Sequence, residues 1–148
     1  MSAQLEVGPL GPGDWTRWLP LARAYKSFYL SDLSDAAAQQ AWQRLMAGDG
    51  VFGLGVRQQG RLQGICHYLF HGSLWMPTVC YLQDLYVDEA CRGQGLAAQL
   101  IEAVAVQARE AGASRLYWQT QATNLRARRL YERLGEHRGF IRYDHRGF

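Results

Sequence analysis

The sequence contains few cysteines, no long apolar run and little excess of charge of either sign. Its three cysteines, Cys66, Cys80 and Cys91, form no Cys-x-x-Cys pair, so neither a disulfide framework nor a zinc motif is indicated. Polar residues interrupt every apolar stretch before the roughly 18 residues that a membrane-spanning helix needs. The formal net charge of +3 gives no reason to expect wholesale binding to nucleic acid or to an anionic membrane.

Neither linkers nor repeats are indicated, and no secretory leader is expected. No stretch rich in Ser, Gly or Pro divides the chain, and nothing recurs at a fixed period. With 148 residues that are 48% apolar, the chain is predicted to fold as one domain over residues 1–148, whose core needs no disulfide or structural metal. Residues 1–10 lack the charged head and apolar segment of a leader, so a cytoplasmic location with reduced thiols is expected.

Two helices are predicted before any strand. The first follows Asp14 as N-cap and places five apolar residues on one face, namely Trp15, Trp18, Ala22, Tyr25 and Tyr29. Pro20 lies inside this pattern, so we expect a short first turn and a main helix that begins near the proline. The second helix begins at Ser34 and Asp35 and ends at Gly48.

The remaining segments predict a mixed α/β fold. Residues 51–56 and 62–70 form a β-hairpin around a turn with Gly60, and residues 79–87 form a third strand. A helix over 95–111, a strand over 115–120 and a helix over 124–134 that ends at Gly135 follow. A short last strand is expected over 140–143. Antiparallel strands followed by a parallel β-α-β-α crossover imply a mixed sheet.

The segment between the third strand and its following helix contains two closely spaced glycines. Gly93 and Gly95 let the backbone approach an anion, the helix N-terminus adds partial positive charge, and Arg92 adds a formal one. A diphosphate fits this chemistry, and a simple tight turn is the alternative. A dinucleotide-binding unit is disfavoured, because five residues separate the strand from the glycines and the next strand ends without a carboxylate. A P-loop is excluded, since no Gly-Lys-Ser/Thr follows the loop.

Two motifs at the right separation give the chain a family resemblance. The loop reads Arg92-Gly93-Gln94-Gly95-Leu96-Ala97, and Asn124 begins the last predicted helix with Tyr131 seven residues later. On these residues and on its order of elements, the chain resembles the GNAT acetyltransferase superfamily. Residues 81–87 and 25–29 resemble the histone and polyamine acetyltransferase-like branch. The resemblance implies the GNAT fold, in which two parallel strands splay to open a cleft for acetyl-CoA.

The resemblance also implies a direct transfer from acetyl-CoA to an amine in a ternary complex. The loop from Arg92 to Ala97 is expected to hold the pyrophosphate and Asn124 to contact the co-substrate. Tyr131 is expected to protonate the departing thiolate, although a Tyr at helical spacing also packs readily in a core. The pantetheine arm and the oxyanion of the tetrahedral intermediate are expected to contact the backbone of Leu85, Tyr86 and Val87.

Asp84 is the candidate for handling the acceptor amine. It is a carboxylate in an otherwise apolar strand, where it could orient a cationic amine or accept its proton through water; a salt bridge with an arginine is the structural alternative. Gln83 is a secondary candidate, and Tyr25 and Tyr29 are candidates for the acceptor pocket. His67, in a strand, makes a poor zinc ligand, and no metal is expected.

The C-terminal region is shorter than the resemblance implies. Gly135 is followed by polar residues and the predicted strand over 140–143 is brief, which leaves a sheet edge under-covered. We therefore expect a homodimer with this strand near its interface. The acceptor could be a small polyamine-like or amino-acid-like molecule or a protein lysine. The alternative to an enzyme is a degenerate acyl-CoA-binding or regulatory module.

Overall fold

The computed structural model describes residues 4–148. The chain divides into two compact units, with the boundary after Trp118. The first unit contains a five-stranded sheet, three α-helices and two short 3-10 helices, η1 (Pro12–Asp14) and η2 (Glu89–Cys91). The second unit contains one α-helix and an irregular segment. The two units are described separately.

The sheet of the first unit has the strand order β1-β2-β3-β4-β5. Its strands are β1 (Leu5–Pro9), β2 (Phe52–Gln58), β3 (Arg61–His71), β4 (Val79–Val87) and β5 (Leu116–Trp118). The pairings from β1 to β4 are antiparallel, and β5 alone is parallel to its neighbour β4. This is the predicted mixed sheet, because the α3 crossover brings β5 back alongside β4 in the same direction.

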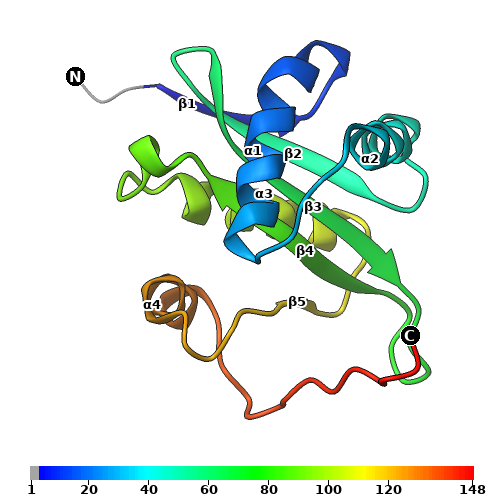
Figure 1. Cartoon of the computed structure of the whole chain (residues 1–148). Helices are drawn as coiled ribbons and strands as arrows, with labels where there is room; N and C mark the ends of the chain where they lie inside the picture. Colours follow the sequence, from blue (N-terminus) through cyan, green and yellow to red (C-terminus); the bar gives the residue numbers. More distant parts are fainter. Residues whose placement is uncertain (1–3) are drawn as a thin grey trace. The chain divides into compact units, whose positions relative to one another are not determined.

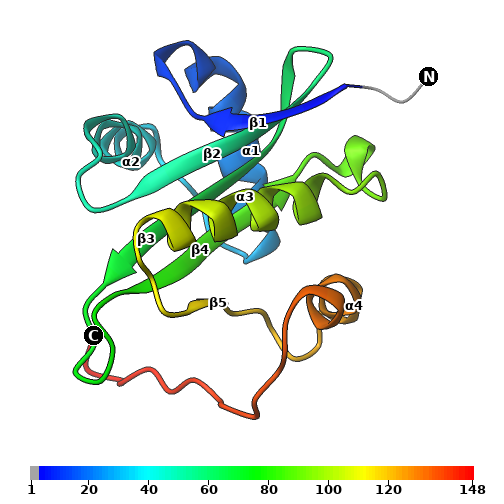
Figure 2. The same cartoon turned by 180° about the vertical axis from the view of Figure 1, so that it is seen from behind.

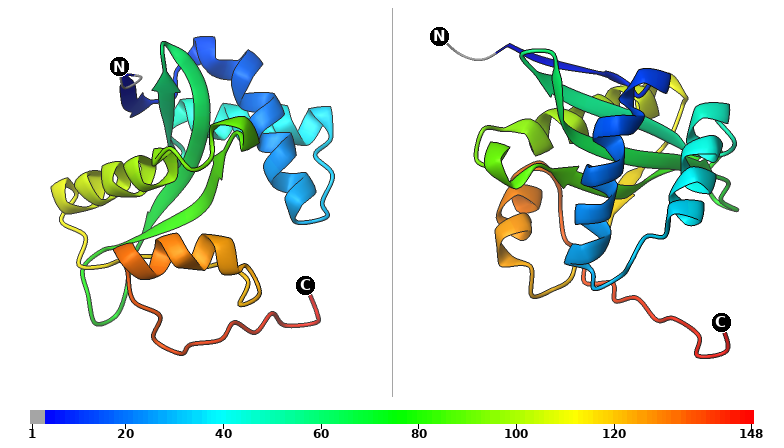
Figure 3. Two further views of the ribbon diagram at one scale, coloured as in Figure 1. Left: turned by 90° about the vertical axis from the view of Figure 1, so that its left-hand side faces the viewer. Right: turned by 45° about the horizontal axis from the view of Figure 1, so that its top comes forward.

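Helices cover both faces of the sheet, as Figures 1 and 2 show from opposite sides. α1 (Trp15–Phe28) and α2 (Asp35–Ala47) cover one face, and α3 (Leu96–Glu110) covers the other, an arrangement seen edge-on in Figure 3. Below α1 and α2 the buried core contains Leu10, Trp18, Leu21, Ala22, Leu45, Leu62 and Ile65. α3 contributes Leu96, Leu100, Ile101, Val104 and Ala108, which are all buried at helical spacing.

Short local signals set several of the predicted boundaries. Ser34 caps α2, with its Oγ accepting a hydrogen bond from the Ala37 amide at 3.1 Å, and Gly48 ends the helix with a φ of 61°. Gln59 and Gly60 join β2 to β3, both with positive φ, as a two-residue hairpin turn of this twist requires. The predicted second helix and hairpin are therefore confirmed.

Three sequence expectations are wrong. A strand, β1, precedes the helices, and its five residues are stabilised by pairing with β2 rather than by a strong local pattern. α1 runs through Pro20 without a break, because a proline in the second turn removes a single backbone hydrogen bond while Trp18, Leu21 and Ala22 bury the same helix. Residues 140–143 form no strand, and the side chains of Phe140, Ile141 and Tyr143 are exposed.

The second unit is built around α4 (Leu125–Leu134), which matches the predicted helix. Asn124 caps it, with Oδ1 accepting from the Ala127 amide at 3.3 Å. Arg128 pairs with Glu132 one turn later at 3.2 Å. Past the helix, Arg142 pairs with Asp144 at 2.8 Å, and residues 135–148 contain neither helix nor strand.

Across the described part of the chain, no helix is long and apolar enough to cross a bilayer. Cys66, Cys80 and Cys91 are all buried free thiols. Burial raises the pKa of the Cys66 thiol to about 12 and that of Cys80 to about 11. These two thiols are therefore protonated and unreactive at neutral pH.

Candidate functional site

A β-bulge in β4 determines which of its side chains face α1. In the pairing of β3 with β4, one step along β3 corresponds to two steps along β4, from Leu82 to Asp84. Gln83 is the extra residue, and its side chain is exposed. Because one added residue reverses the alternation of a strand, Tyr81 and Asp84 share a face although they are three residues apart. The bulge thus gathers polar and aromatic groups on the α1 side of the sheet.

Asp84 lies directly opposite His67 on β3 and is joined to it by a hydrogen bond. His67 Nδ1 is 2.9 Å from Asp84 Oδ2, and the two side chains are only 14% and 20% exposed. On its other side, His67 Nε2 accepts a hydrogen bond from Trp18 Nε1 at 2.9 Å. Three elements, α1, β3 and β4, therefore meet in one line of polar contacts.

The charge of Asp84 is set by opposing effects. Burial acts to raise the pKa of its carboxyl, but opposing effects outweigh it, led by the hydrogen bond from His67 and including a hydrogen bond from Tyr25 and the charge of Lys26. The net pKa lies below the ordinary value of 3.8. Asp84 is therefore an ionised carboxylate, mostly screened from water, at neutral pH.

Tyrosines surround this carboxylate. Burial, together with the negative charge of Asp84, raises the pKa of Tyr25 and that of Tyr29, so both hydroxyls keep their protons. The rings of Tyr25 and Tyr29 meet edge-on with centroids 5.1 Å apart, and Tyr81 stacks on Tyr117 of β5 at 4.8 Å. A carboxylate flanked by aromatic faces is suited to bind an alkylammonium.

The backbone of β4 is only partly paired on the side of β5. The parallel ladder contains three pairs and ends where Leu82 meets Trp118. Past this point β4 continues to Val87 with β3 on one side and no strand of the described sheet on the other. Residues 85–87, the segment predicted to contact the pantetheine arm, thus keep one row of amide and carbonyl groups without a strand partner.

Hydrogen bonds fix the start of the glycine loop. Asp88 Oδ1 accepts from the Ala90 amide at 3.0 Å, and Asp88 Oδ2 lies 3.5 Å from Nη2 of Arg17. Arg92 Nε donates to the carbonyl of Val87 at 3.3 Å. These contacts fix the backbone between the end of β4 and the loop glycines.

The two loop glycines adopt a conformation that disfavours side chains. Gly93 has a φ of 80° and Gly95 a φ of 83°, and a Cβ at either position would meet open space. Gly95 is the N-cap of α3 and offers no side chain to the first helical amides. Gln94 bonds to Gln58 at 2.7 Å on the surface. The loop residues from Arg92 to Ala97 thus present an accessible helix N-terminus, a fit for a phosphate group.

Two predicted site residues belong to the second unit. Asn124 is the N-cap of α4, and its Nδ2 donates to Thr120 Oγ1 at 3.4 Å. Tyr131 lies seven residues later in the same helix, where its carbonyl accepts from the Gly135 amide at 2.7 Å. Capping accounts for Asn124 as a helix-starting residue, and the roles of both side chains toward acetyl-CoA stay predictions.

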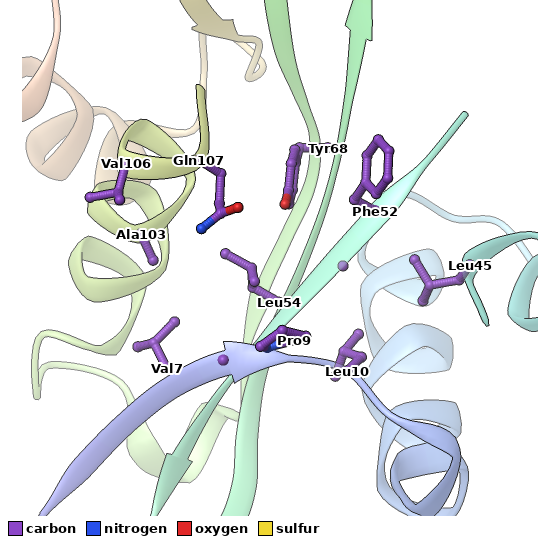
Figure 4. A pocket seen from close by; sticks show the side chains of 12 residues that line it. Val7, Pro9, Leu10, Leu45, Phe52, Leu54, Tyr68, Ala103, Val106 and Gln107 are labelled. Atoms are coloured by element: carbon purple, nitrogen blue, oxygen red, sulfur yellow. The ribbon is translucent and has the colours of Figure 1, made fainter. Parts of the chain in front are cut away.

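A hollow of about 470 Å³ lies elsewhere, between the β1–β2 edge and α3 (Figure 4). Its lining is mainly aliphatic and aromatic, with the Tyr68 hydroxyl and the Gln107 amide as side-chain polar groups. The lining residues are Val7, Gly8, Pro9, Leu10, Leu45, Phe52, Gly53, Leu54, Tyr68, Ala103, Val106 and Gln107. Burial raises the pKa of Tyr68 to about 12, so the hollow offers no group that exchanges a proton near neutral pH.

The sequence does not predict that His67 and Trp18 belong to the site. For His67 the sequence raises only metal binding, and the described residues hold no cluster of three His, Cys, Asp or Glu side chains that could bind a metal. The pairing of His67 with Asp84 depends on the β3–β4 register. This register cannot be predicted from the sequence, because seven residues connect the two strands and β4 contains a bulge at Gln83. Trp18 was assigned to the helix core, where it also lies.

Comparisons with known proteins agree with this architecture. Residues 15–135 match the family described as Acetyltransferase (GNAT) family. The D-amino-acid N-acetyltransferase HPA3 of Saccharomyces cerevisiae is 29% identical over 98% of this chain and 92% of its own length. The uncharacterized N-acetyltransferase YhfO of Bacillus subtilis is 34% identical over 84% of this chain and 85% of its own. A thialysine N-epsilon-acetyltransferase of Bos taurus is 38% identical over 51% of this chain and 48% of its own.

Solved structures give the same fold. The aminoglycoside N-acetyltransferase AAC(6')-Iy in complex with CoA superposes with a TM-score of 0.84 at 18% identity, covering 99% of this chain and 97% of that one. A ribosomal-protein-alanine N-acetyltransferase from Brucella melitensis gives a TM-score of 0.78 at 22% identity, covering 97% and 99%. With the fold, the loop and the family match in agreement, this chain belongs to the GNAT family of acetyltransferases.

Proposed function

We propose that this N-acetyltransferase transfers the acetyl group of acetyl-CoA directly to a primary amine in a ternary complex. The observation that supports this most is the ionised Asp84, screened from water among tyrosines at the point where β4 loses its β5 partner. A cationic acceptor would bind the carboxylate, while the thioester lies along the free edge of β4. The accessible N-terminus of α3 after Gly95 would take the pyrophosphate.

The reaction needs an uncharged amine, because an alkylammonium with a pKa of about 10.4 has no lone pair to attack with. Asp84 would orient the ammonium and take its proton, directly or through water. The amine nitrogen then attacks the thioester carbon, forming the C–N bond and an oxyanion that a backbone amide of residues 85–87 would stabilise. The C–S bond breaks as the intermediate collapses, and Tyr131 would protonate the leaving thiolate.

The acceptor is proposed to be a small amine or a lysine side chain. Relatives of this chain are named for D-amino acids and for thialysine, both of which carry primary amines. Tyr25 of α1 and Tyr29, the C-cap residue of that helix, would contact the alkyl part of such a molecule beside Asp84. Gln83 is a secondary candidate for contact. Amino acids, polyamines and basic peptides therefore form the acceptor screen.

Calorimetric titration with acetyl-CoA tests the co-substrate site, with NAD and ATP as comparison ligands. Gly95→Leu should abolish acetyl-CoA binding, because the new side chain projects into the space before α3. Gly112→Leu is the matched control: Gly112 follows the other end of α3 and has a φ of 77° and equally open surroundings. The two variants carry the same backbone strain. Equal acetyl-CoA affinity in both would contradict the loop assignment.

The non-catalytic alternative, an acyl-CoA-binding or regulatory module, is separated by turnover. Acetyl-CoA binding without acetylation of any amine in the screen would favour that alternative. Release of free CoA in step with loss of the acceptor's amine would favour the enzyme. The family match from residue 15 to residue 135 spans the boundary between the two units, which supports their acting as one domain.

A homodimer is also proposed. Phe140, Ile141 and Tyr143 are 86%, 74% and 86% exposed in the single chain, an arrangement that association with a second copy would relieve. Sedimentation at micromolar concentration should give a dimer, and replacing all three side chains by Ser should give a monomer. A monomeric wild-type protein would contradict the proposal.

A further inference from the structure

The hydrogen bonds of His67 fix where its proton lies. The Trp18 indole can only donate, and it donates to His67 Nε2 at 2.9 Å. The ionised Asp84 carboxylate can only accept, and its Oδ2 lies 2.9 Å from Nδ1. A single ring state satisfies both partners: a neutral imidazole with its proton on Nδ1.

A second proton on the ring would conflict with Trp18. It would place an N–H on Nε2 directly against the indole N–H, and one of the two donors would lose its partner in a buried place. Trp18 is 3% exposed and packs against Trp15 and Trp42, with ring centroids 5.8 Å and 5.0 Å away. Turning the indole away from His67 would disturb both of these ring contacts.

We infer that Trp18 and His67 are positioning residues for Asp84, which orient the carboxylate and leave it with its full negative charge. Trp18 keeps His67 neutral, and neutral His67 donates to Asp84 without cancelling its charge. This inference rests on the proposed role of Asp84 as the site for the acceptor amine. An imidazolium in the same place would form an ion pair with Asp84 and compete with a cationic acceptor.

The other groups around the pair do not take over this function. Tyr25 of α1 and Tyr29, its C-cap residue, face Asp84 as protonated phenols, and Lys26 is exposed. On β4, Tyr81 and Tyr86 are the neighbouring titratable residues on this face. Cys66 next to His67 points to the opposite face of β3. The residue opposite His67 on β2 is Gly53, which has no side chain. His67 is thus the residue whose ring nitrogens join Asp84 to Trp18.

Nitrogen-15 NMR of the histidine rings tests the tautomer directly. The wild-type protein should show His67 as the neutral Nδ1–H form at about pH 8 and still at about pH 6, where free imidazoles become protonated. Trp18→Phe removes the donor but keeps an aromatic ring, so His67 should become protonated over the same range. Trp15→Phe is the matched control. It replaces an indole of the same cluster by the smaller Phe ring, and Trp15 contacts Trp18 rather than His67. A wild-type ring with its proton on Nε2, or on both nitrogens, overturns the inference.

Binding of n-butylammonium, followed by NMR titration, tests the consequence for the acceptor. For Trp18→Phe the affinity should fall about tenfold from pH 8 to pH 6, while wild type and Trp15→Phe should change less than about threefold. At about pH 8, His67→Leu should weaken binding about tenfold, whereas His67→Asn should keep affinity near wild type, because the Asn amide can donate from the place of Nδ1. Equal pH profiles for Trp18→Phe and wild type, or equal affinities for the two His67 variants, overturn the inference.

Asp84→Asn separates this inference from the proposed function. If Asp84→Asn loses n-butylammonium while the Trp18 and His67 variants keep it, the positioning role fails and the amine site stands. If Asp84→Asn binds n-butylammonium like wild type, the amine site fails and the positioning role fails with it. Loss of binding in Asp84→Asn, together with the expected Trp18 and His67 results, supports both.

Discussion

His67 and Asp84 are 17 residues apart in sequence and face each other across the β3–β4 pair, with Nδ1 and Oδ2 2.9 Å apart. The contact exists because the bulge at Gln83 turns Asp84 to the α1 side, where His67 already points. In a regular strand of the same sequence, Asp84 would instead share a face with Leu82, which is 3% exposed. A local irregularity of one strand thus places the single carboxylate of β4 among the tyrosines of α1.

Asp84→Asn is expected to lower kcat/KM for the acceptor by about tenfold to a hundredfold, because the amide keeps the shape of the side chain and removes its charge. The KM for acetyl-CoA should not change. Steady-state kinetics with each substrate varied in turn measures both effects. Asp49→Asn, at an exposed position, is the control. An unchanged acceptor kcat/KM in Asp84→Asn would remove the carboxylate from the mechanism.

The same carboxylate gives a prediction about pH. The pKa of Asp84 lies below 3.8, so the group stays ionised throughout the neutral and mildly acidic range. Protonation of Asp84 should therefore not limit acceptor binding above about pH 5. An acidic limb of the kcat/KM profile in that range that disappears in Asp84→Asn would contradict this assignment.

Much of the fold could be predicted because its signals are local. Ser34 and Gly48 bound α2, and the turn at Gly60 and the glycines before α3 lie where their backbone angles are needed. β1 could not be predicted in this way, since five residues that include Gly8 and Pro9 form a strand only when β2 supplies hydrogen bonds. The helix break predicted at Pro20 is wrong for a similar reason, because the tertiary burial of α1 outweighs one missing backbone hydrogen bond.

The candidate site divides along the same line. The sequence predicts the loop glycines from a motif, Asp84 as a carboxylate in an apolar strand and Tyr25 as a candidate for the acceptor pocket. Asp84 and Tyr25 are joined by a hydrogen bond. The pairing of His67 with Asp84 could not be predicted, because strand register is a property of the whole sheet and no sequence motif marks a lone histidine in a strand. The contact of Trp18 with His67 could not be predicted, because a tryptophan on the buried face of a helix is explained by the apolar area of its ring. It is the indole N–H that bonds to His67.

Tyr131→Phe is expected to lower turnover by about a hundredfold or more while acetyl-CoA still binds, since it removes one proton donor and little volume. Tyr143→Phe removes the same atom from an exposed ring of the same unit and should leave turnover unchanged. Turnover is measured as the rate of free CoA release, and binding by calorimetry. Similar turnover in both variants would show that Tyr131 is not the general acid.

Gly64→Ala is expected to destabilise the fold by about 1–3 kcal/mol through overpacking. A Cβ at this position would lie 2.8 Å from Val56 Cγ1 and 3.2 Å from the backbone oxygen of Tyr86, which cannot move without disturbing the sheet. Gly8→Ala is the control, because a Cβ there meets nothing within 4 Å. Urea unfolding of the two variants should differ accordingly, and equal midpoints would contradict the close contact.

Asp14→Asn is expected to lower stability at neutral pH and to lose this effect in acid. Asp14 forms a paired contact with Arg57, both N–O distances being 2.7 Å, and its Oδ2 accepts from the Gly11 amide at 2.8 Å. The hydrogen bond from Arg57 holds the pKa of Asp14 below 3.8, against the opposing effect of burial. A carboxyl whose pKa is lower in the folded than in the unfolded protein stabilises the fold in its ionised form.

The sign of the pH dependence follows directly. The contribution of Asp14 is complete above the unfolded-state pKa and disappears as the pH falls through the folded-state pKa, below 3.8. The difference in unfolding free energy between wild type and Asp14→Asn should be about 1–2 kcal/mol near pH 7 and should shrink as the pH falls below about 4. Asp144→Asn is the control, because the Arg142–Asp144 pair is 63% and 72% exposed, and solvent-screened pairs contribute about 0–1 kcal/mol. If the difference in unfolding free energy for Asp14→Asn stays constant down to about pH 2, the charge of Asp14 is not what stabilises the fold through Arg57.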